Sequence, residues 1–155
     1  MLAIALLMVT VADSKDPCLT FMRGDKSATN ACVEFEIARL SIADESPSAI
    51  QNLSGLGADA IPLLKNALNS TKETVRAGAS DALGRIAVRS DATRQQEIFR
   101  ALVKWKADPS VAVRTRVAGA AARVSANLPE RSEILAAARN DTDESVRRVV
   151  AGVKQ

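Results

Sequence analysis

Three stretches of the chain carry apolar residues at helical spacing, and each begins with a Val-Arg pair. The arginines of these pairs are Arg76, Arg114 and Arg147, which lie 38 and 33 residues apart. Apolar residues follow the arginines at offsets of three, seven and ten: Ala79, Leu83 and Ile86, then Val117, Ala121 and Val124, then Val150 at the first of these offsets. Because these offsets lie on one side of a helix, each pair predicts an amphipathic helix with its apolar stripe facing a core.

Another helical pattern precedes each of these stretches. The predicted helices cover residues 58–69, 93–107 and 129–140, and short polar turns such as "NSTKE" and "NDTDES" follow them. Pro129 fits the first turn of its helix, where a missing N–H does no harm. Each repeat is therefore predicted to consist of a first helix, a tight turn and a second helix that begins at the Val-Arg pair.

The second helices also carry small or branched residues on the face opposite the apolar stripe. These residues are Ala77, Gly84 and Val88 in one repeat and Gly119, Ala122 and Ala126 in the next. Small side chains let a neighbouring helix approach closely, so the second helices are predicted to pack on two sides. Glycine inside a helix costs about 0.5 to 1 kcal/mol relative to alanine, and close packing at Gly78, Gly84 and Gly119 is expected to offset that cost.

A period of this length, with a recurring Val-Arg pair and a turn acid, is typical of stacked repeats. The segments "LGADAIPLLKNALNSTKETVRAGASDALGRIA" and "ILAAARNDTDESVRRVVAGV" resemble the HEAT repeat family, in particular its short repeats of the phycobilisome-lyase type. The resemblance spans residues 46–155. It implies an all-α, right-handed, armadillo-like α-solenoid of about three HEAT-like helical hairpins with an N-terminal cap.

The resemblance also implies a ladder of ion pairs between neighbouring repeats, in which a turn aspartate pairs with the arginine six residues later. Asp108 with Arg114 and Asp141 with Arg147 keep this spacing. The first repeat has Ser70 where the acid is expected, so the rung at Arg76 is predicted to be weakened.

The N-terminal part of the chain divides into two further segments. Residues 1–12, "MLAIALLMVTVA", match the apolar core of a signal peptide, although their only positive charge is the terminal amine; an interfacial helix or a partner-docked helix is the alternative. Residues 13–45 are expected to cap the first repeat, because terminal repeats need a polar outer surface. This division predicts a secreted or periplasmic protein, with a cytoplasmic location as the alternative.

Cys18 and Cys32 are the two cysteines of the chain, and both follow the apolar leader. After export they are expected to form a disulfide, whereas two separate thiols are the expectation for a reducing compartment. The chain has no histidine, which excludes His-based catalytic arrangements and His-based metal sites. We therefore expect a non-catalytic protein without a metal or another cofactor.

Charge is distributed unevenly along the chain. Residues 13–57 carry 4 basic and 7 acidic side chains, and residues 58–155 carry 17 and 11. Arg85 and Arg123 each lie nine residues after the arginine that opens their helix, and Arg89 and Arg116 extend the same rows. This spacing predicts an arginine stripe beside the packed faces, which is either a binding surface or a solvated helix face.

The stripe is the predicted binding surface for a protein partner along the second helices, since stacked repeats form extended surfaces. Trp105 is a candidate contact with the partner, because tryptophan is enriched in protein interfaces. Burial of its side chain in the repeat is the alternative. Polyanion or nucleic-acid binding is the second hypothesis, and a lyase-type enzyme or its accessory subunit the third. We expect neither a nucleic acid nor, after removal of the leader, a membrane as the partner.

The C-terminal repeat is expected to leave an apolar end that favours self-association, formed by Val149, Val150 and Val153.

Overall fold

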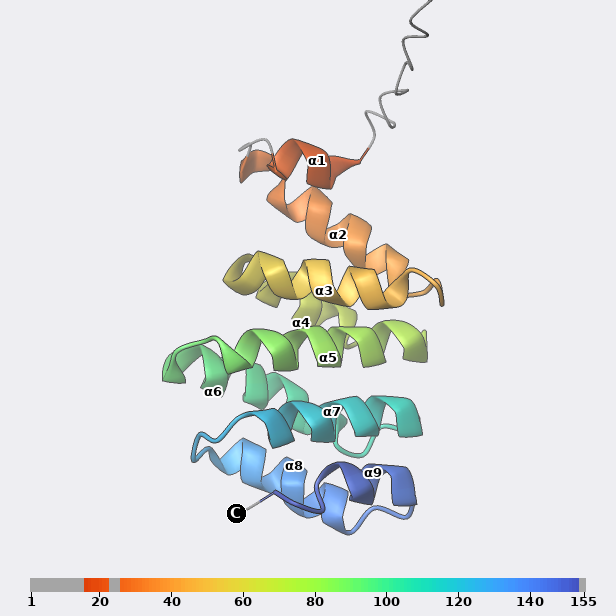
Figure 1. The fold of residues 1–155 in the computed structure, drawn as a ribbon, viewed down its shortest axis with the longest axis vertical. Helices are drawn as coiled ribbons and strands as arrows, with labels where there is room; N and C mark the ends of the chain where they lie inside the picture. Colours follow the sequence, from red (N-terminus) through yellow and green to blue (C-terminus); the bar gives the residue numbers. More distant parts are fainter. Residues whose placement is uncertain (1–15, 23–25, 154–155) are drawn as a thin grey trace, which may run out of the picture.

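The described part of the chain is built from helices. The computed structural model describes residues 16–22 and 26–153, and every regular element in those ranges is a helix (Figure 1). The predicted leader, residues 1–12, lies outside the described residues. None of the described helices is both long enough and apolar enough to span a membrane.

The helices stack in two layers along one axis (Figure 1). One layer holds the second helices, α3 (Ser46–Leu56), α5 (Glu73–Val88), α7 (Val111–Arg123) and α9 (Glu144–Val149); the other holds α4 (Ile61–Ala67), α6 (Ala92–Leu102) and α8 (Pro129–Arg139). The pairs α4/α5, α6/α7 and α8/α9 are the three predicted hairpins. The structure therefore confirms an all-α solenoid of HEAT-like hairpins.

The first helices are shorter than the sequence predicts, and 3-10 turns complete two of them. The turn η2 (Gly57–Ala60) precedes α4, and η3 (Val103–Trp105) follows α6. Pro62 lies in the first turn of α4, where its missing N–H interrupts no helical hydrogen bond. Gly57 has a φ of 63°, which glycine adopts without steric cost, and α3 ends there.

The apolar stripe of the second helices forms the core, as predicted. All seven residues at the predicted offsets are buried, from Ala79 in α5 to Val150 just after α9. The small opposite face differs from the prediction in part. Val88 is 51% exposed at the last residue of α5, whereas Ile86 and Ala87 in the same turn are buried.

The glycines show how unevenly the second helices approach one another. A Cβ at Gly84 in α5 would lie 2.6 Å from the Cβ of Ala120 in α7, so these two helices touch almost backbone to backbone. A Cβ at Gly119 would have its nearest contact, with Val149 of α9, at 3.8 Å, which is an ordinary van der Waals distance. The predicted close packing at Gly119 is therefore wrong, because the short helix α9 stands further from α7.

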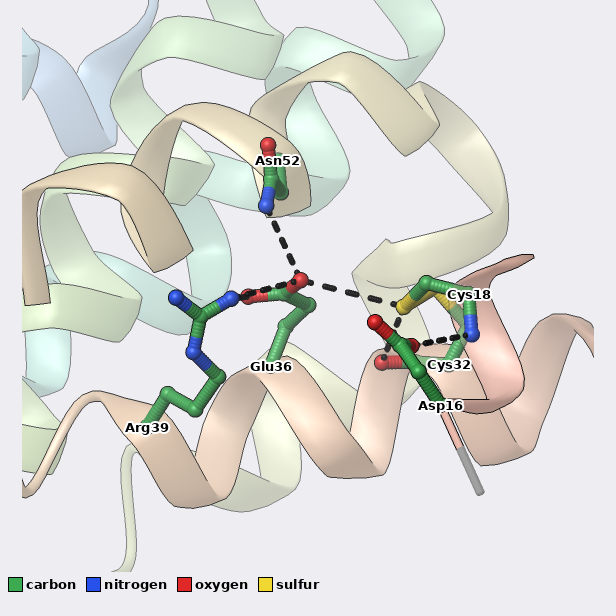
Figure 2. Close-up of a disulfide and its surroundings, with 6 residues drawn as sticks. All are labelled: Asp16, Cys18, Cys32, Glu36, Arg39 and Asn52. Carbon is green, nitrogen blue, oxygen red and sulfur yellow. Dashed lines mark hydrogen bonds and ion pairs between the residues drawn. A yellow bond between two sulfur atoms is a disulfide. The ribbon is translucent and has the colours of Figure 1, made fainter. Parts of the chain in front are cut away.

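The N-terminal part adds α1 (Pro17–Met22), η1 (Lys26–Ala28) and α2 (Thr29–Arg39) to the stack. The predicted disulfide between Cys18 and Cys32 is present and ties α1 to α2 (Figure 2). Inside α2, the buried carboxylate of Glu36 accepts hydrogen bonds from Arg39 and, at 2.9 Å, from the Asn52 side chain of α3. Because α2 packs on both α3 and α4, it continues the stack across the predicted boundary at residue 46.

The C-terminal repeat is better covered than the sequence predicts. Val150 is fully buried, and Val149 and Val153 are half-buried against the core. The expected apolar end is therefore wrong for these valines, since α9 turns them toward α7 and α8.

Candidate functional site

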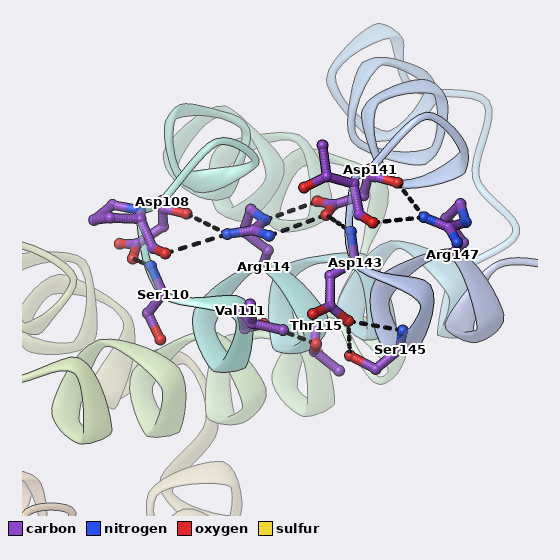
Figure 3. Close-up of polar contacts among 11 residues, drawn as sticks. Asp108, Ser110, Val111, Arg114, Thr115, Asp141, Asp143, Ser145 and Arg147 are labelled. Carbon is purple, nitrogen blue, oxygen red and sulfur yellow. Dashed lines mark hydrogen bonds and ion pairs between the residues drawn. The ribbon is translucent and has the colours of Figure 1, made fainter.

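The predicted ladder lies along the turns that join the helices of each hairpin. Arg76 donates two hydrogen bonds to the carboxylate of Asp108, from Nε at 2.8 Å and from Nη2 at 3.0 Å. Arg114 binds Asp141 in the same bidentate way, at 2.7 and 3.0 Å (Figure 3). Each pair joins one hairpin to the next.

The pairing within the ladder differs from the prediction. The remaining Nη1 of each arginine donates to the turn of its own hairpin: Arg114 to the backbone oxygen of Asp108 at 2.9 Å, and Arg147 to that of Asp141 at 2.6 Å. The arginine six residues after the aspartate thus binds the backbone carbonyl of that aspartate. The carboxylate of the aspartate instead binds the arginine of the preceding hairpin. The predicted side-chain pairs Asp108 with Arg114 and Asp141 with Arg147 are corrected accordingly.

Ser70 does not weaken the rung at Arg76, because a serine supplies a backbone carbonyl as well as an aspartate does. Arg76 Nη1 lies 2.9 Å from the Ser70 oxygen, and its carboxylate partner comes from Asp108. The fourth residue of α5, α7 and α9 is an arginine, whereas the fourth residue of α3 is Ala49. The acid missing at Ser70 is therefore matched by a missing arginine in the preceding hairpin.

The ladder pairs are buried and close to neutral in total charge. The side chain of Asp108 is fully buried and that of Arg76 is 11% exposed. Burial raises the pKa of Asp108, whereas the hydrogen bonds from Arg76 and the Ser110 backbone N–H lower it, so its pKa lies below the ordinary value. The Arg114 hydrogen bond likewise lowers the pKa of Asp141. These features give the ladder a structural role.

Three of the four arginines of the predicted stripe meet at Asp81, a carboxylate that the stripe prediction did not include. Arg123 Nη1 donates to Oδ1 of Asp81 at 2.7 Å, and Arg85 donates to Oδ2 from Nη2 at 3.2 Å. Arg116 Nη1 stands 3.7 Å from the same Oδ2, an ion pair without a hydrogen bond. We call Arg85, Arg116, Arg123 and Asp81 the arginine cluster; it joins α5 to α7.

The arginine cluster keeps its carboxylate buried and its cations exposed. The side chain of Asp81 is 1% exposed, and those of Arg85, Arg116 and Arg123 are 47%, 50% and 39% exposed. Three guanidinium groups over one carboxylate leave a surplus of two positive charges at the surface. This surplus distinguishes the cluster from the ladder.

A glycine of α5 and a glycine of α7 lie beneath the guanidinium group of Arg123 in the cluster. A Cβ at Gly84 would lie 3.4 Å from Nη1 of Arg123, and a Cβ at Gly119 would lie 3.9 Å from Nη2. The guanidinium of Arg123 therefore crosses from α7 toward α5 over positions that have no side chain. The small residues that the sequence predicted for helix packing also make room for this cation.

The fourth arginine of the predicted stripe, Arg89, does not join the cluster. It is the C-cap residue of α5, and its Nη2 donates to the backbone oxygen of Ser54 in α3. Because the helix ends at Val88, the four-residue spacing from Arg85 no longer places Arg89 on the same row. The predicted continuous stripe is corrected to a local cluster.

Trp105, the other candidate contact, lies in η3 among the first helices. Its side chain is half-buried and packs against the core. This position favours the alternative prediction, burial in the repeat.

A groove adjoins the cluster on the second-helix layer. It has a volume of about 240 Å³ and runs between the start of α5 and the neighbouring helices. Its apolar lining includes Leu40, Ile50 and Ala77, and its charged lining residues are Glu73 and Arg116. Mostly apolar lining next to a surplus of positive charge suits a protein segment that combines apolar and acidic side chains. We call this groove and the arginine cluster together the second-helix face.

No metal centre is apparent among the residues that the structure describes. These residues contain no group of three or more cysteine, aspartate or glutamate side chains placed to hold a metal ion. The buried carboxylates of Asp81, Asp108 and Asp141 are each paired with arginine.

Comparison with known proteins relates the stacked hairpins to one family. The family model described as sister chromatid cohesion protein PDS5 protein matches residues 41–153, which include α3 to α9. A search of curated proteins finds no match. The matched range covers most of the chain and supports HEAT-like repeats as its architecture. The chain therefore belongs to the sister chromatid cohesion protein PDS5 family.

Proposed function

We propose that the chain is a protein-interaction module that binds a partner along the second-helix face. The observation that carries this proposal is the surplus of two positive charges on three half-exposed arginines held by the buried Asp81. A charge-neutral, buried pair like Arg76 and Asp108 serves stability, whereas exposed cations in excess of their carboxylate, beside a mostly apolar groove, favour recognition. The stacked hairpins provide the rigid support that such a surface needs.

The family supports this role at a coarse level. HEAT-like repeat proteins generally act as non-catalytic scaffolds, and we propose the same for this chain. On the Val-Arg spacing alone, we propose that its repeats are of the short type found in phycobilisome lyases, without extending the lyase activity to it. The cohesion role in the family description is not carried over, because the disulfide is compatible with an oxidising compartment.

Site-specific photo-crosslinking in extracts of the source cells tests the proposal. A photoreactive residue replaces Ala112, which is exposed on α7 and lines the groove, or Thr93, which is exposed on α6 in the other layer. We expect a discrete adduct from position 112 that excess unmodified protein abolishes, and no such adduct from position 93. Equal adducts from both positions, or none from position 112, would contradict binding along the second-helix face.

Polyanion binding is the second candidate, and the exposed arginines of the cluster favour it. It predicts salt-dependent retention on heparin that an Arg85→Glu, Arg123→Glu double variant abolishes. Two observations favour the protein partner instead. Asp81 neutralises part of the positive charge of the arginines, and Arg89 binds Ser54 and does not extend the arginine cluster. A chain that is not retained on heparin at low salt would eliminate this candidate.

We also propose that residues 1–12 direct export and that residues 13–45 cap the repeats of residues 46–155. The apolar leader and the disulfide support this organisation, since disulfides persist in oxidising compartments. Mass spectrometry of material secreted by the source cells should find a chain that lacks the leader. Recovery of a chain that retains Met1 would contradict cleavage.

A further inference from the structure

We infer that the arginine cluster binds the carboxylate of a glutamate or aspartate in an acidic segment of the partner protein, while an apolar side chain of that segment enters the adjoining groove. This inference rests on the proposed function and specifies the chemistry of the partner. The cluster is the anchor, and Asp81 is a positioning residue that does not touch the partner.

The cluster has hydrogen-bond donors to spare. A guanidinium carries five N–H groups, yet Arg123 uses Nη1 toward Asp81, and Arg116 approaches Asp81 only to 3.7 Å. Their side chains are 39% and 50% exposed. Arginine binds carboxylates through two parallel N–H groups, so the free edges of these guanidinium groups suit an incoming carboxylate.

Few other charges on the surrounding helices compete for these cations. α7 itself contains no acid, and the acids of α8, which packs against it, are Glu130 and Glu133, which pair with Arg100 and Lys106. The acids of α5 are Asp81 and Glu73, which lines the groove together with Arg116, and Glu144 of α9 pairs with Arg148. One added carboxylate reduces the local surplus of two positive charges to one, and a second carboxylate on the same segment can neutralise the rest.

Asp81 prepares the site before the partner arrives. Its carboxylate holds Arg85 from the same helix and Arg123 from the next, which brings cations from sequence positions far apart to one point. Like charges held together repel one another, and the buried carboxylate offsets that repulsion. Binding therefore costs little side-chain ordering.

The surroundings favour an acidic protein segment over a nucleic acid or a glycan. A polyanion needs a long row of cations, and Arg89 interrupts the row by binding Ser54. The groove beside Arg116 is lined by Leu40, Ile50 and Ala77, which suit an apolar side chain. Base-stacking aromatics of the kind that single-stranded nucleic acids use are absent from this lining.

Fluorescence anisotropy with a defined peptide tests the inference on the whole chain. The probe is a fluorescein-labelled peptide of alternating Glu and Leu, and its control is the same peptide with Gln in place of Glu. We expect the Glu peptide to bind at low salt, more weakly as salt increases, and the Gln peptide not to bind. The Arg116→Gln variant should weaken binding about two- to fivefold, because one exposed ion pair is lost.

Arg100→Gln is the matched control, since it removes one exposed arginine from α6 in the other layer. It should leave the affinity for the Glu peptide unchanged. Equal weakening by both variants, or absence of binding to wild-type protein, would overturn the inference, and tighter binding to heparin than to the peptide would replace it with the polyanion candidate. A position-specific adduct at Ala112 would still support the proposed function if the Glu peptide failed to bind.

Discussion

Two regions of this solenoid use the same chemistry for different ends. Along the turns, the carboxylate of Asp108 is matched by one arginine, Arg76, and the pair is buried. On the second-helix face, Asp81 is equally buried but holds three arginines that remain half-exposed. The two regions differ in the ratio of arginine to carboxylate and in the exposure of the arginines. The ladder pairs stabilise the stack, whereas the arginine cluster is proposed to present positive charge to a partner.

Removal of a ladder carboxylate should have the largest effect on stability. Asp108→Asn leaves Arg76 buried without its counterion, so we expect the free energy of unfolding to fall by about 3 kcal/mol. Urea unfolding measures this change. Asp91→Asn is the matched control, because Asp91 is exposed and asparagine also caps a helix well; a loss as large as that of Asp108→Asn would contradict the structural role of the ladder.

Substitution of the glycines tests how the second helices support the cluster. Gly84→Ala places a methyl group 2.6 Å from Ala120 Cβ and 3.4 Å from Arg123 Nη1, so we expect a loss of about 2 kcal/mol from overpacking. Gly119→Ala meets its nearest atom at 3.8 Å and should instead raise stability by about 0.5 kcal/mol, since alanine is the better helix former. Thermal unfolding distinguishes the signs, and equal losses would contradict the difference between the two interfaces.

Asp81→Asn should cost less stability than Asp108→Asn. We expect a loss of about 1 kcal/mol, because the half-exposed guanidinium groups of the cluster can turn to water. The same variant should weaken binding of the Glu-Leu peptide despite its added positive charge, since the arginines are no longer held together. Stronger binding would show that Asp81 competes with the partner and does not position the arginines.

Acid should weaken the ladder, because protonation removes the negative charges that face its arginines. The folded-state pKa values of Asp108 and Asp141 lie below the ordinary value of about 3.9. Their contribution to stability is therefore fully present above about pH 4 and is lost as the pH falls through the folded-state pKa values. Urea unfolding at a series of acidic pH values should show a smaller decrease for Asp108→Asn than for wild type, and an equal decrease would contradict the linkage.

The layered fold follows from local patterns that a sequence displays. The Val-Arg pairs and the apolar offsets after them predict helices because helical periodicity places Ala79, Leu83 and Ile86 on one side. The disulfide between Cys18 and Cys32 was also predictable, since the chain has two cysteines and both follow the apolar residues 1–12. Helix ends were less predictable: Pro62 and the 3-10 turns shortened the first helices through local geometry that periodicity does not encode.

The partners of the buried carboxylates depend on distances between hairpins, which no spacing within one repeat specifies. The six-residue spacing from Asp108 to Arg114 was real, yet it marked a backbone contact, while the carboxylate reached Arg76. Asp81 was visible four residues before Arg85, but its role depends on Arg116 and Arg123 in the next hairpin. That Arg89 lies outside the arginine cluster could not be predicted without knowing that α5 ends at Val88.

The nitrogen-detected NMR signals of the arginine side chains test the distinction between the two regions most directly. On addition of the Glu-Leu peptide, we predict shifts in the Nε signals of Arg85, Arg116 and Arg123, with those of Arg76 and Arg114 unchanged. Shifts at Arg76 and Arg114, or no shifts at Arg85, Arg116 and Arg123, would contradict the division of the arginines into a structural ladder and a binding cluster.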